Sequence, residues 1–256
     1  MRINGVVFYE GPSTIDGSPI VAIATFKSAN KKTGDMIQTW IIRADAHPVD
    51  AIHKGLDSSI CGDCPLRGIV AKAGRKSRNA HRACYVRVQQ APAAVYRAYK
   101  RGSYPTLNDL HRSCFANKAL RFGSYGDPVA VPMKHWDYLT SFATNKKRPG
   151  YTHQWKTSAF AAWSSRIMAS VHTTEEKQRA NDAGWRTFRT VTSVDDLAKD
   201  EILCPASEEG GFTRNCLECG ACNGSRGPSD RRHNVAIVGH GTAGKAQRVF
   251  ELSISK

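Results

Sequence analysis

The amino-acid sequence predicts an α/β protein with a mainly parallel sheet, arranged as a partial or decorated β/α barrel. Two observations lead to this fold class. The first 45 residues alternate short apolar runs with Gly-, Pro- and Asn-containing turns, which is typical of antiparallel strands. From residue 91 onward, short strands alternate with helical segments, the pattern of βαβ units. A doubly wound open sheet is the alternative.

The individual elements follow from local signals in chain order. A helix at 91–102 is favoured by Pro92 near its start and Gly102 at its end. A second helix is expected to begin with Thr106 as its cap. The expected strands are 6–10, 18–26, 37–44, 119–124, 150–155, 167–172, 186–193, 201–206 and 234–241, and the expected helices are 47–57, 91–102, 106–118, 132–144, 158–166 and 173–185.

These elements suggest one folded unit with three parts. Residues 1–56 form an N-terminal antiparallel β segment, and residues 57–90 form a basic, irregular loop with cysteines. Residues 91–256 form the barrel-like core, which carries a second cysteine cluster at 204–224. A chain of 256 residues is long enough for one sizeable core.

Composition narrows the class of function. The chain carries 37 Lys and Arg against 22 Asp and Glu, a formal net charge of +15, which favours a polyanionic partner such as DNA or RNA. It has no long apolar run and no secretory signal, so we expect a cytoplasmic protein without membrane contact. In a reducing cytoplasm, eight cysteines indicate metal ligation rather than disulfides.

The C-terminal cysteines form the stronger of two metal-site patterns. Cys216, Cys219 and Cys222 have C-x-x-C-x-x-C spacing, and Cys204 stands upstream before a proline. Bacterial ferredoxins bind iron–sulfur clusters with a closely similar run and a Cys-Pro from elsewhere. A [4Fe–4S] cluster on these four thiolates is the first choice, and a structural Zn²⁺ site is the alternative.

The N-terminal cysteines form a less complete pattern. Cys61 and Cys64 make a C-x-x-C pair, and Cys84 follows a long basic loop. Three thiolates on a four-iron cluster leave one iron open for a small chelating cosubstrate. A zinc knuckle completed by Cys114 or His81 is equally consistent with the spacing.

Polar residues gather at the predicted strand ends, which meet at one edge of a parallel sheet. Asp127 follows two glycines, and we expect it to act as a general base or nucleophile. His153 and His172 end the next two predicted strands and complete the expected catalytic set, and His240 follows a later one. Each of these residues alone is more often a turn, cap or hydrogen-bonded structural residue.

A glycine-rich segment follows the last predicted strand. Residues 239–246 match both dinucleotide-binding and P-loop patterns, but too few residues follow for the first, and the Ser or Thr needed after the lysine of the second is missing. A turn before a final strand is the simpler interpretation. The remaining possibility is a phosphate cradle, as late loops of β/α barrels often provide. Its members are Gly239, Gly241, Gly244 and Lys245.

The segments SANKKTGDMIQTW (28–40), CGDC (61–64) and ACYV (83–86) resemble a family of uncharacterised tailed-phage proteins with a Cys-rich C-terminal part. Those proteins are similar to phage three-cysteine-motif proteins that look like radical S-adenosylmethionine enzymes, which fold as partial β/α barrels. The resemblance spans most of residues 28–240. It implies S-adenosylmethionine as a cosubstrate and the cytoplasm of an infected bacterial host. The C-x-x-x-C-x-x-C motif of the true enzymes is absent.

Three functions are consistent with these observations. The leading one is a metalloenzyme, with an iron–sulfur cluster, that acts on nucleic acid or a nucleotide. A zinc-stapled, non-catalytic nucleic-acid-binding protein is the first alternative. A transglycosylase-like base-exchange enzyme, with a thiolate-bound zinc and a nucleophilic aspartate, is the second.

Overall fold

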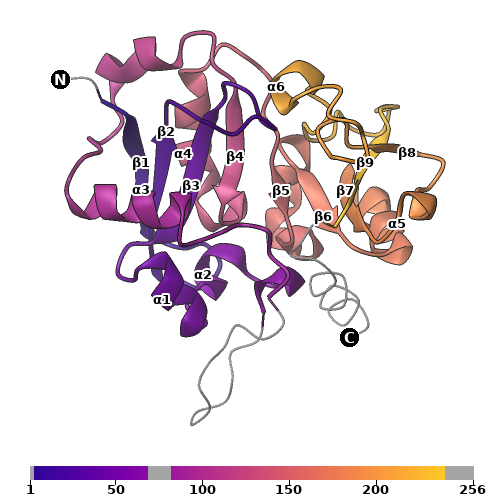
Figure 1. Ribbon diagram of the computed structural model, residues 1–256, viewed down its shortest axis with the longest axis horizontal. Helices are drawn as coiled ribbons and strands as arrows, with labels where there is room; N and C mark the ends of the chain where they lie inside the picture. The colour runs from indigo at the N-terminus through magenta and orange to yellow at the C-terminus, as the bar shows by residue number, and fades with distance from the viewer. Residues whose placement is uncertain (1–2, 69–81, 240–256) are drawn as a thin grey trace.

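The computed structural model describes residues 3–68 and 82–239, which form an α/β protein with two sheets. The first sheet has the strand order β1-β2-β3-β4 and the second has the order β5-β6-β7-β9-β8. Figure 1 shows the two sheets next to each other, with helices packed around them. The α/β class is therefore confirmed, with one mixed four-stranded sheet and one parallel five-stranded sheet.

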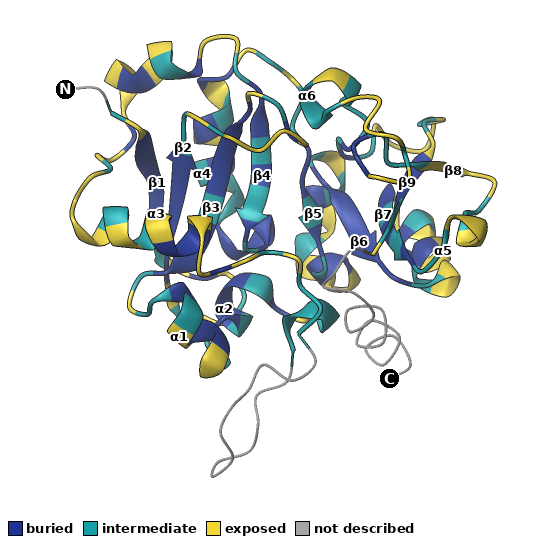
Figure 2. Cartoon of the chain, in the orientation of Figure 1, coloured by how far each residue is buried: buried dark blue, intermediate teal, exposed yellow. Residues whose placement is uncertain are grey.

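The first sheet contains the predicted antiparallel segment. Its strands are β1 (Gly5–Pro12), β2 (Pro19–Thr25), β3 (Ile37–Arg43) and β4 (Leu120–Tyr125). Strands β1 to β3 pair antiparallel, whereas β4 pairs parallel to β3. Most residues of β1, β2 and β3 are buried, as their dark blue colour in Figure 2 shows, because apolar runs supply both faces of these strands.

The second sheet is entirely parallel. Its strands are β5 (Tyr151–Thr152), β6 (Met168–Val171), β7 (Thr187–Val191), β8 (Glu201–Leu203) and β9 (Asn234–Val238). Each crossover returns the chain to the same edge, so all five strands end on one side.

The two sheets meet at β4. The amide of Leu120 donates to the carbonyl of Lys147 (3.3 Å), and that of Phe122 donates to the carbonyl of Pro149 (2.8 Å). Residues 147–149 lead directly into β5, so the carboxyl ends of β4 and β5 lie close together. A single functional site can therefore draw residues from both sheets.

α-Helices lie in the predicted segments 47–57, 91–102, 132–144 and 173–185, and two further short α-helices were not predicted. The α-helices are α1 (Pro48–His53), α2 (Ser58–Cys61), α3 (Ala91–Lys100), α4 (Met133–Ser141), α5 (Thr174–Asp182) and α6 (Cys216–Cys219). Short 3-10 helices span Pro65–Arg67, Asp109–Phe115, Pro128–Ala130, Gln154–Lys156, Ser158–Ser165 and Val194–Asp196.

Two predicted α-helices are 3-10 helices instead. The helix expected at 106–118 is confined to Asp109–Phe115, and its cap is Asn108 rather than Thr106. Thr106 forms a parallel bridge with Val7 at the edge of β1, which keeps the chain extended there. The segment expected at 158–166 is a 3-10 helix over Ser158–Ser165, with its Trp163 buried against Trp136.

The core joins the first sheet to α4. Trp136 is fully buried, with its ring 4.4 Å from that of Phe122 and 4.9 Å from that of Phe8. Helix α4 therefore covers the face of β4 that carries Phe122. Neighbouring residues of a strand point to opposite faces, so this packing leaves the other face of β4 for the site described next.

Candidate metal centres

The four C-terminal cysteines lie together. Cys204 directly follows β8, Cys216 and Cys219 begin and end α6, and Cys222 lies two residues beyond its cap. All four line one small cavity of about 20 Å³, whose remaining walls are apolar or backbone. The four predicted ligands therefore border the same small cavity.

Local sequence explains this arrangement. The Asn215 side chain accepts from the amide of Glu218, and the Glu218 carboxylate accepts from the amide of Asn215, both at 3.0 Å. This capping box fixes the start of α6 at Cys216. Gly220 ends the helix with φ +65°, a left-handed conformation that favours glycine and turns the chain back toward Cys222.

Burial makes three of these thiols poor acids without a metal. It raises the pKa of Cys222 to about 12 and also raises the pKa values of Cys204 and Cys216, and the neighbouring cysteines act in the same direction. A bound cation reverses this preference, because a coordinating thiol is deprotonated. A donor set of four sulfurs fits an iron–sulfur cluster or zinc and does not fit the oxygen-seeking Mg²⁺ or Ca²⁺.

The three N-terminal cysteines also converge. Cys61 ends α2, Cys64 caps Pro65–Arg67, and amides 83 and 84 both donate to the Leu66 carbonyl, at 3.1 and 2.9 Å. That contact brings Cys84 back beside the pair. Cys114 lies on the Asp109–Phe115 turn and does not line the cavity that the three thiols share, and His81 is outside the described residues.

An ion pair fixes the loop that carries this group. Arg67 donates to the Asp57 carboxylate at 2.7 Å and to the Gly62 carbonyl at 3.0 Å. A Cβ at Gly62 would lie 2.3 Å from the side-chain amide of Gln154, so the loop packs tightly against the segment after β5.

Within the described ranges, no group of three or more His, Cys, Asp or Glu side chains is arranged to hold a metal ion. A four-iron cube separates its thiolates further than a single ion does.

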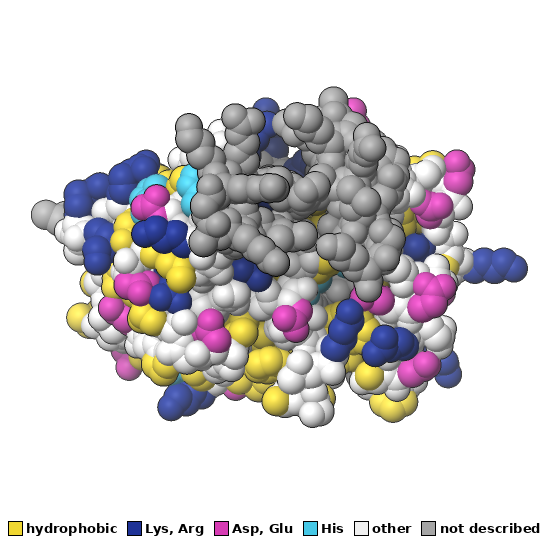
Figure 3. Space-filling view, turned by 90° about the horizontal axis from the view of Figure 1, so that it is seen from below, with side chains coloured by type: hydrophobic (Ala, Val, Ile, Leu, Met, Phe, Trp, Pro, Cys, Tyr) yellow, Lys and Arg dark blue, Asp and Glu magenta, His cyan; other side chains and the backbone are white. Residues whose placement is uncertain are grey.

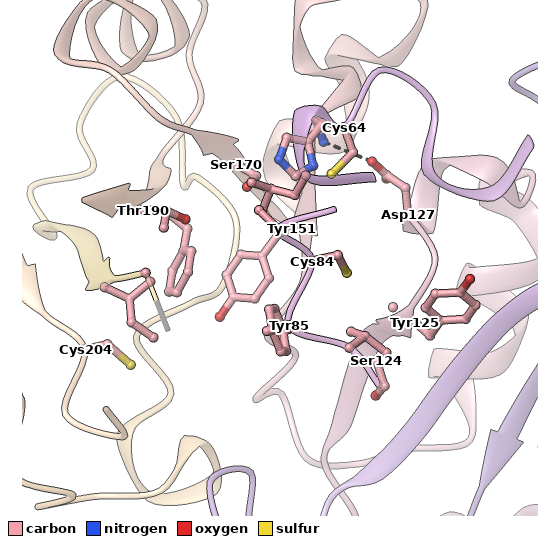
Figure 4. A pocket seen from close by; sticks show the side chains of 18 of the residues that line it. Cys64, Cys84, Tyr85, Ser124, Tyr125, Asp127, Tyr151, Ser170, Thr190 and Cys204 are labelled. Atoms are coloured by element: carbon pink, nitrogen blue, oxygen red, sulfur yellow. Dashed lines mark hydrogen bonds between the residues drawn. The ribbon is translucent and has the colours of Figure 1, made fainter. Parts of the chain in front are cut away.

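Both cysteine groups border one larger cavity of about 380 Å³. Figure 4 shows Cys64 and Cys84 on one side, Cys204 on the other, and Tyr85 and Tyr151 between them. Its other lining residues come mainly from β4 to β9 and the turns after them. They include Lys32, Arg121, Asp127, His153, Ser170, Phe188, Thr190, Thr192, Cys216 and Gly239.

Asp127 lies in this cavity wall as a hydrogen-bonded turn residue. One carboxylate oxygen accepts from the Val129 amide (3.2 Å), and the other accepts from the Thr152 hydroxyl and the His153 amide (both 2.9 Å). Burial raises the pKa of Asp127 to about 7, although these hydrogen bonds favour the ionised form. With three donors on its two oxygens, Asp127 ties the end of β4 to the end of β5, and this geometry favours positioning over nucleophilic attack.

His153 and His172 form a pair behind this wall. Their Nε2 atoms are 3.0 Å apart, and their rings stack at 14° with centroids 5.2 Å apart. At that distance one ring must donate and the other must accept, so the pair shares a proton. Burial lowers the pKa of His172 to about 4, and it also lowers the pKa of His153 well below its usual value, where the neighbouring His172 adds to the effect. His153 lines the cavity, and His172 is buried beneath it.

The other predicted site residues fall largely outside the described part of the chain. Gly239 lines the cavity, whereas His240, Gly241, Gly244 and Lys245 belong to residues 240–256, which are not described. Sequence reasoning did not identify Arg121 or Lys32, which line the cavity. The available signal was weak: one arginine in an otherwise apolar strand and one lysine in a basic turn.

The basic charge is distributed on the described surface. The face drawn in Figure 3 carries Lys and Arg at several separate places, with Asp and Glu between them. Most of the basic cluster expected at 72–82 lies in the segment that is not described. No helix in residues 3–68 and 82–239 has the length and apolar character to cross a membrane.

Comparisons with known proteins add no relative. No family model, curated protein or solved structure matches this chain. Its function must therefore be argued from its own residues.

Proposed function

We propose that this protein is an iron–sulfur enzyme that acts on nucleic acid or a nucleotide in the cavity between its two cysteine groups. The observation that carries the proposal is the convergence of both groups on one cavity with the His153–His172 pair. A binding protein that uses metal only to staple loops needs no such cavity. Enzyme sites, by contrast, combine an apolar cavity with a few polar and titratable groups.

The two groups differ in the coordination they offer. Cys204, Cys216, Cys219 and Cys222 offer a set of four ligands around one small cavity. Cys61, Cys64 and Cys84 provide three and border the large cavity. A four-iron cluster held by those three would leave one iron open, and when bound it would supply a coordination site for a chelating cosubstrate such as S-adenosylmethionine.

The fold supports this assignment. We infer that strands β3 to β9 form an incomplete β/α barrel, with the first cysteine group in the connection after β3. The hydrogen bonds between β4 and residues 147–149 join the two sheets along one edge. The cavity lies at the carboxyl ends of the strands, where β/α barrels hold their active sites.

The chain's own residues would hold the substrate and move a proton. His153 presents a neutral imidazole to the cavity, and His172 can pass a proton to it across 3.0 Å. Asp127 fixes His153 through the backbone amide. The transglycosylase-like alternative needs a free nucleophilic aspartate, so the occupied carboxylate of Asp127 gives it less support. The zinc-stapled binding protein remains the competing account.

The open coordination site gives a direct test. Adding S-adenosylmethionine to the reduced, metal-loaded protein should change the electron paramagnetic resonance spectrum of one cluster. Cys84→Ser should remove that response, and Cys114→Ser, whose thiol lies outside the cavity, should retain it. A wild-type spectrum that is identical with and without the cosubstrate would count against an open iron.

Nucleic-acid binding should be strong at low salt and fall steeply as salt is added. The net charge of +15 predicts several phosphate contacts, each of which adds about −0.9 to the slope of log affinity against log salt on duplex DNA. Fluorescence anisotropy with labelled DNA and RNA measures this slope. Absent binding at low salt, or binding that ignores salt, would remove nucleic acid as a partner and favour a small anionic substrate.

A further inference from the structure

Arg121 places a cationic group in the cavity wall. It alternates along β4 with Phe122, which packs on Trp136 of α4, so the arginine faces the opposite side. Its guanidinium donates to the hydroxyl of Tyr85 at 3.1 Å. Tyr85 itself lines the cavity, although 64% of its surface is exposed.

This positive charge has no carboxylate partner among the described residues. Neither Arg121 nor Lys32 forms an ion pair within residues 3–68 and 82–239. The Lys32 ammonium lies 5.6 Å from the ring centroid of Phe212. Among the described lining residues, Asp127 is the carboxylate, and three hydrogen bonds occupy it. Arg121 and Lys32 therefore contact no carboxylate among the described residues, and both are available to a ligand.

The second cysteine group also lies near Arg121. Cys216 and Cys222 are close enough to interact electrostatically with Arg121. Four thiolates around a dicationic metal centre keep a net negative charge, which offsets part of the positive charge at Arg121. On the cavity side, the guanidinium can still bind a phosphate or carboxylate through paired hydrogen bonds.

Aromatic faces lie beside this cation. Tyr85, Tyr151 and Phe188 all line the cavity, and the rings of Tyr151 and Phe188 lie 4.2 Å apart. Figure 4 shows Tyr85 and Tyr151 in the middle of the space, between the two cysteine groups. Stacking on aromatic side chains is the usual way that proteins hold an unpaired base. A cavity of about 380 Å³ is within the size range of small-ligand sites.

We propose that this cavity binds a single nucleoside monophosphate unit, with its phosphate on Arg121 and Lys32 and its base against Tyr85 and Tyr151. The proposal rests on the proposed function, since it names the substrate class of the same cavity. It describes one nucleotide, whether free or turned out of a strand, rather than a duplex. The basic exterior and the cavity would then bind different parts of the substrate.

Isothermal titration calorimetry of the metal-loaded protein tests Arg121 as the anchor of the phosphate. The probes are the four ribonucleoside 5′-monophosphates, with the matching nucleosides as the base-only arm and inorganic phosphate as the anion-only arm. Arg121→Met should weaken binding of at least one monophosphate roughly 10- to 100-fold, the worth of a charge-assisted hydrogen bond, and should weaken nucleoside binding much less. Lys134→Gln removes one exposed charge on α4, across the sheet, and should bind like the wild type.

The outcomes separate this proposal from the proposed function. If Arg121→Met binds monophosphates as tightly as the wild type, or if no monophosphate binds the wild type, the anchor is wrong while the metal centres can stand. If Arg121→Met loses metal, the arginine serves the thiolate site and the anchor is again wrong. If the anaerobically purified protein contains no iron and still binds monophosphates through Arg121, the anchor is correct and the proposed iron–sulfur enzyme is wrong.

Discussion

Replacing Cys219 with serine should strip the metal from the C-terminal site and unfold the segment around it. Residues 204–224 contain one four-residue helix, and the apolar cluster beside them has only Met168, Cys222 and Val235 as buried members. Hydrogen bonds from Lys147 and Arg186 also hold the backbone of this segment, but few buried apolar side chains do, so metal ligation should contribute most to its stability. For structural zinc in small domains this coupling is worth about 10 kcal/mol or more.

Metal analysis together with hydrogen exchange measures this effect. Amide protection should be lost over residues 204–224 in Cys219→Ser and retained in β1 to β3, whose core is separate. Cys114→Ser is the matched control, because its thiol is also partly buried but lies on the Asp109–Phe115 turn. Unchanged metal content and an unchanged melting temperature in Cys219→Ser would show that the four thiols hold no metal.

Replacing Arg189 with methionine should destabilise the protein by about 3–5 kcal/mol, the cost of leaving one partner of a buried ion pair alone. Arg189 on β7 donates to both carboxylate oxygens of Glu201 on β8, at 2.8 and 2.5 Å. The side chains of Arg189 and Glu201 are only 5% and 0% exposed. The pair fixes β8, which ends one residue before Cys204, so the same variant should also weaken metal retention at that site.

Urea denaturation of the metal-loaded protein gives the free energy of unfolding. The double variant Arg189→Met/Glu201→Leu removes both charges and should recover much of the loss, because no buried charge is left unpaired. The exposed Lys199→Gln variant in the turn before β8 controls for charge alone. A loss in Arg189→Met no larger than in Lys199→Gln would mean that the pair contributes little.

The strands were predictable because their signals are local. β-branched runs bounded by Gly and Pro mark β2 and β3, and alternation with helices indicates parallel pairing from β4 onward. The 3-10 helix at Asp109–Phe115 was not predictable in the same way. Its start depends on the Asn108 cap and on a bridge from Thr106 to Val7, a contact across about a hundred residues of chain.

The sequence predicts where the site residues lie better than it predicts what each of them does. Strand ends of a parallel sheet share one edge, so Asp127 and His153 were expected together and both line the cavity. The hydrogen bonds that occupy Asp127 come from residues 129, 152 and 153, and no local pattern reveals them. Arg121 was missed for a similar reason, since its surroundings come from β5, the second cysteine group and residue 85.

Iron, zinc and acid-labile sulfide analysis of the anaerobically purified protein tests the iron–sulfur assignment. Two four-iron clusters would give about eight iron and eight sulfide per chain, four of each at either cysteine group, with the broad visible absorption of iron–sulfur clusters. Cys61→Ser/Cys64→Ser/Cys84→Ser should retain about half of the iron, held by the C-terminal four. Zinc in place of iron, with no sulfide at either group, would contradict the account and leave a zinc-stapled binding protein.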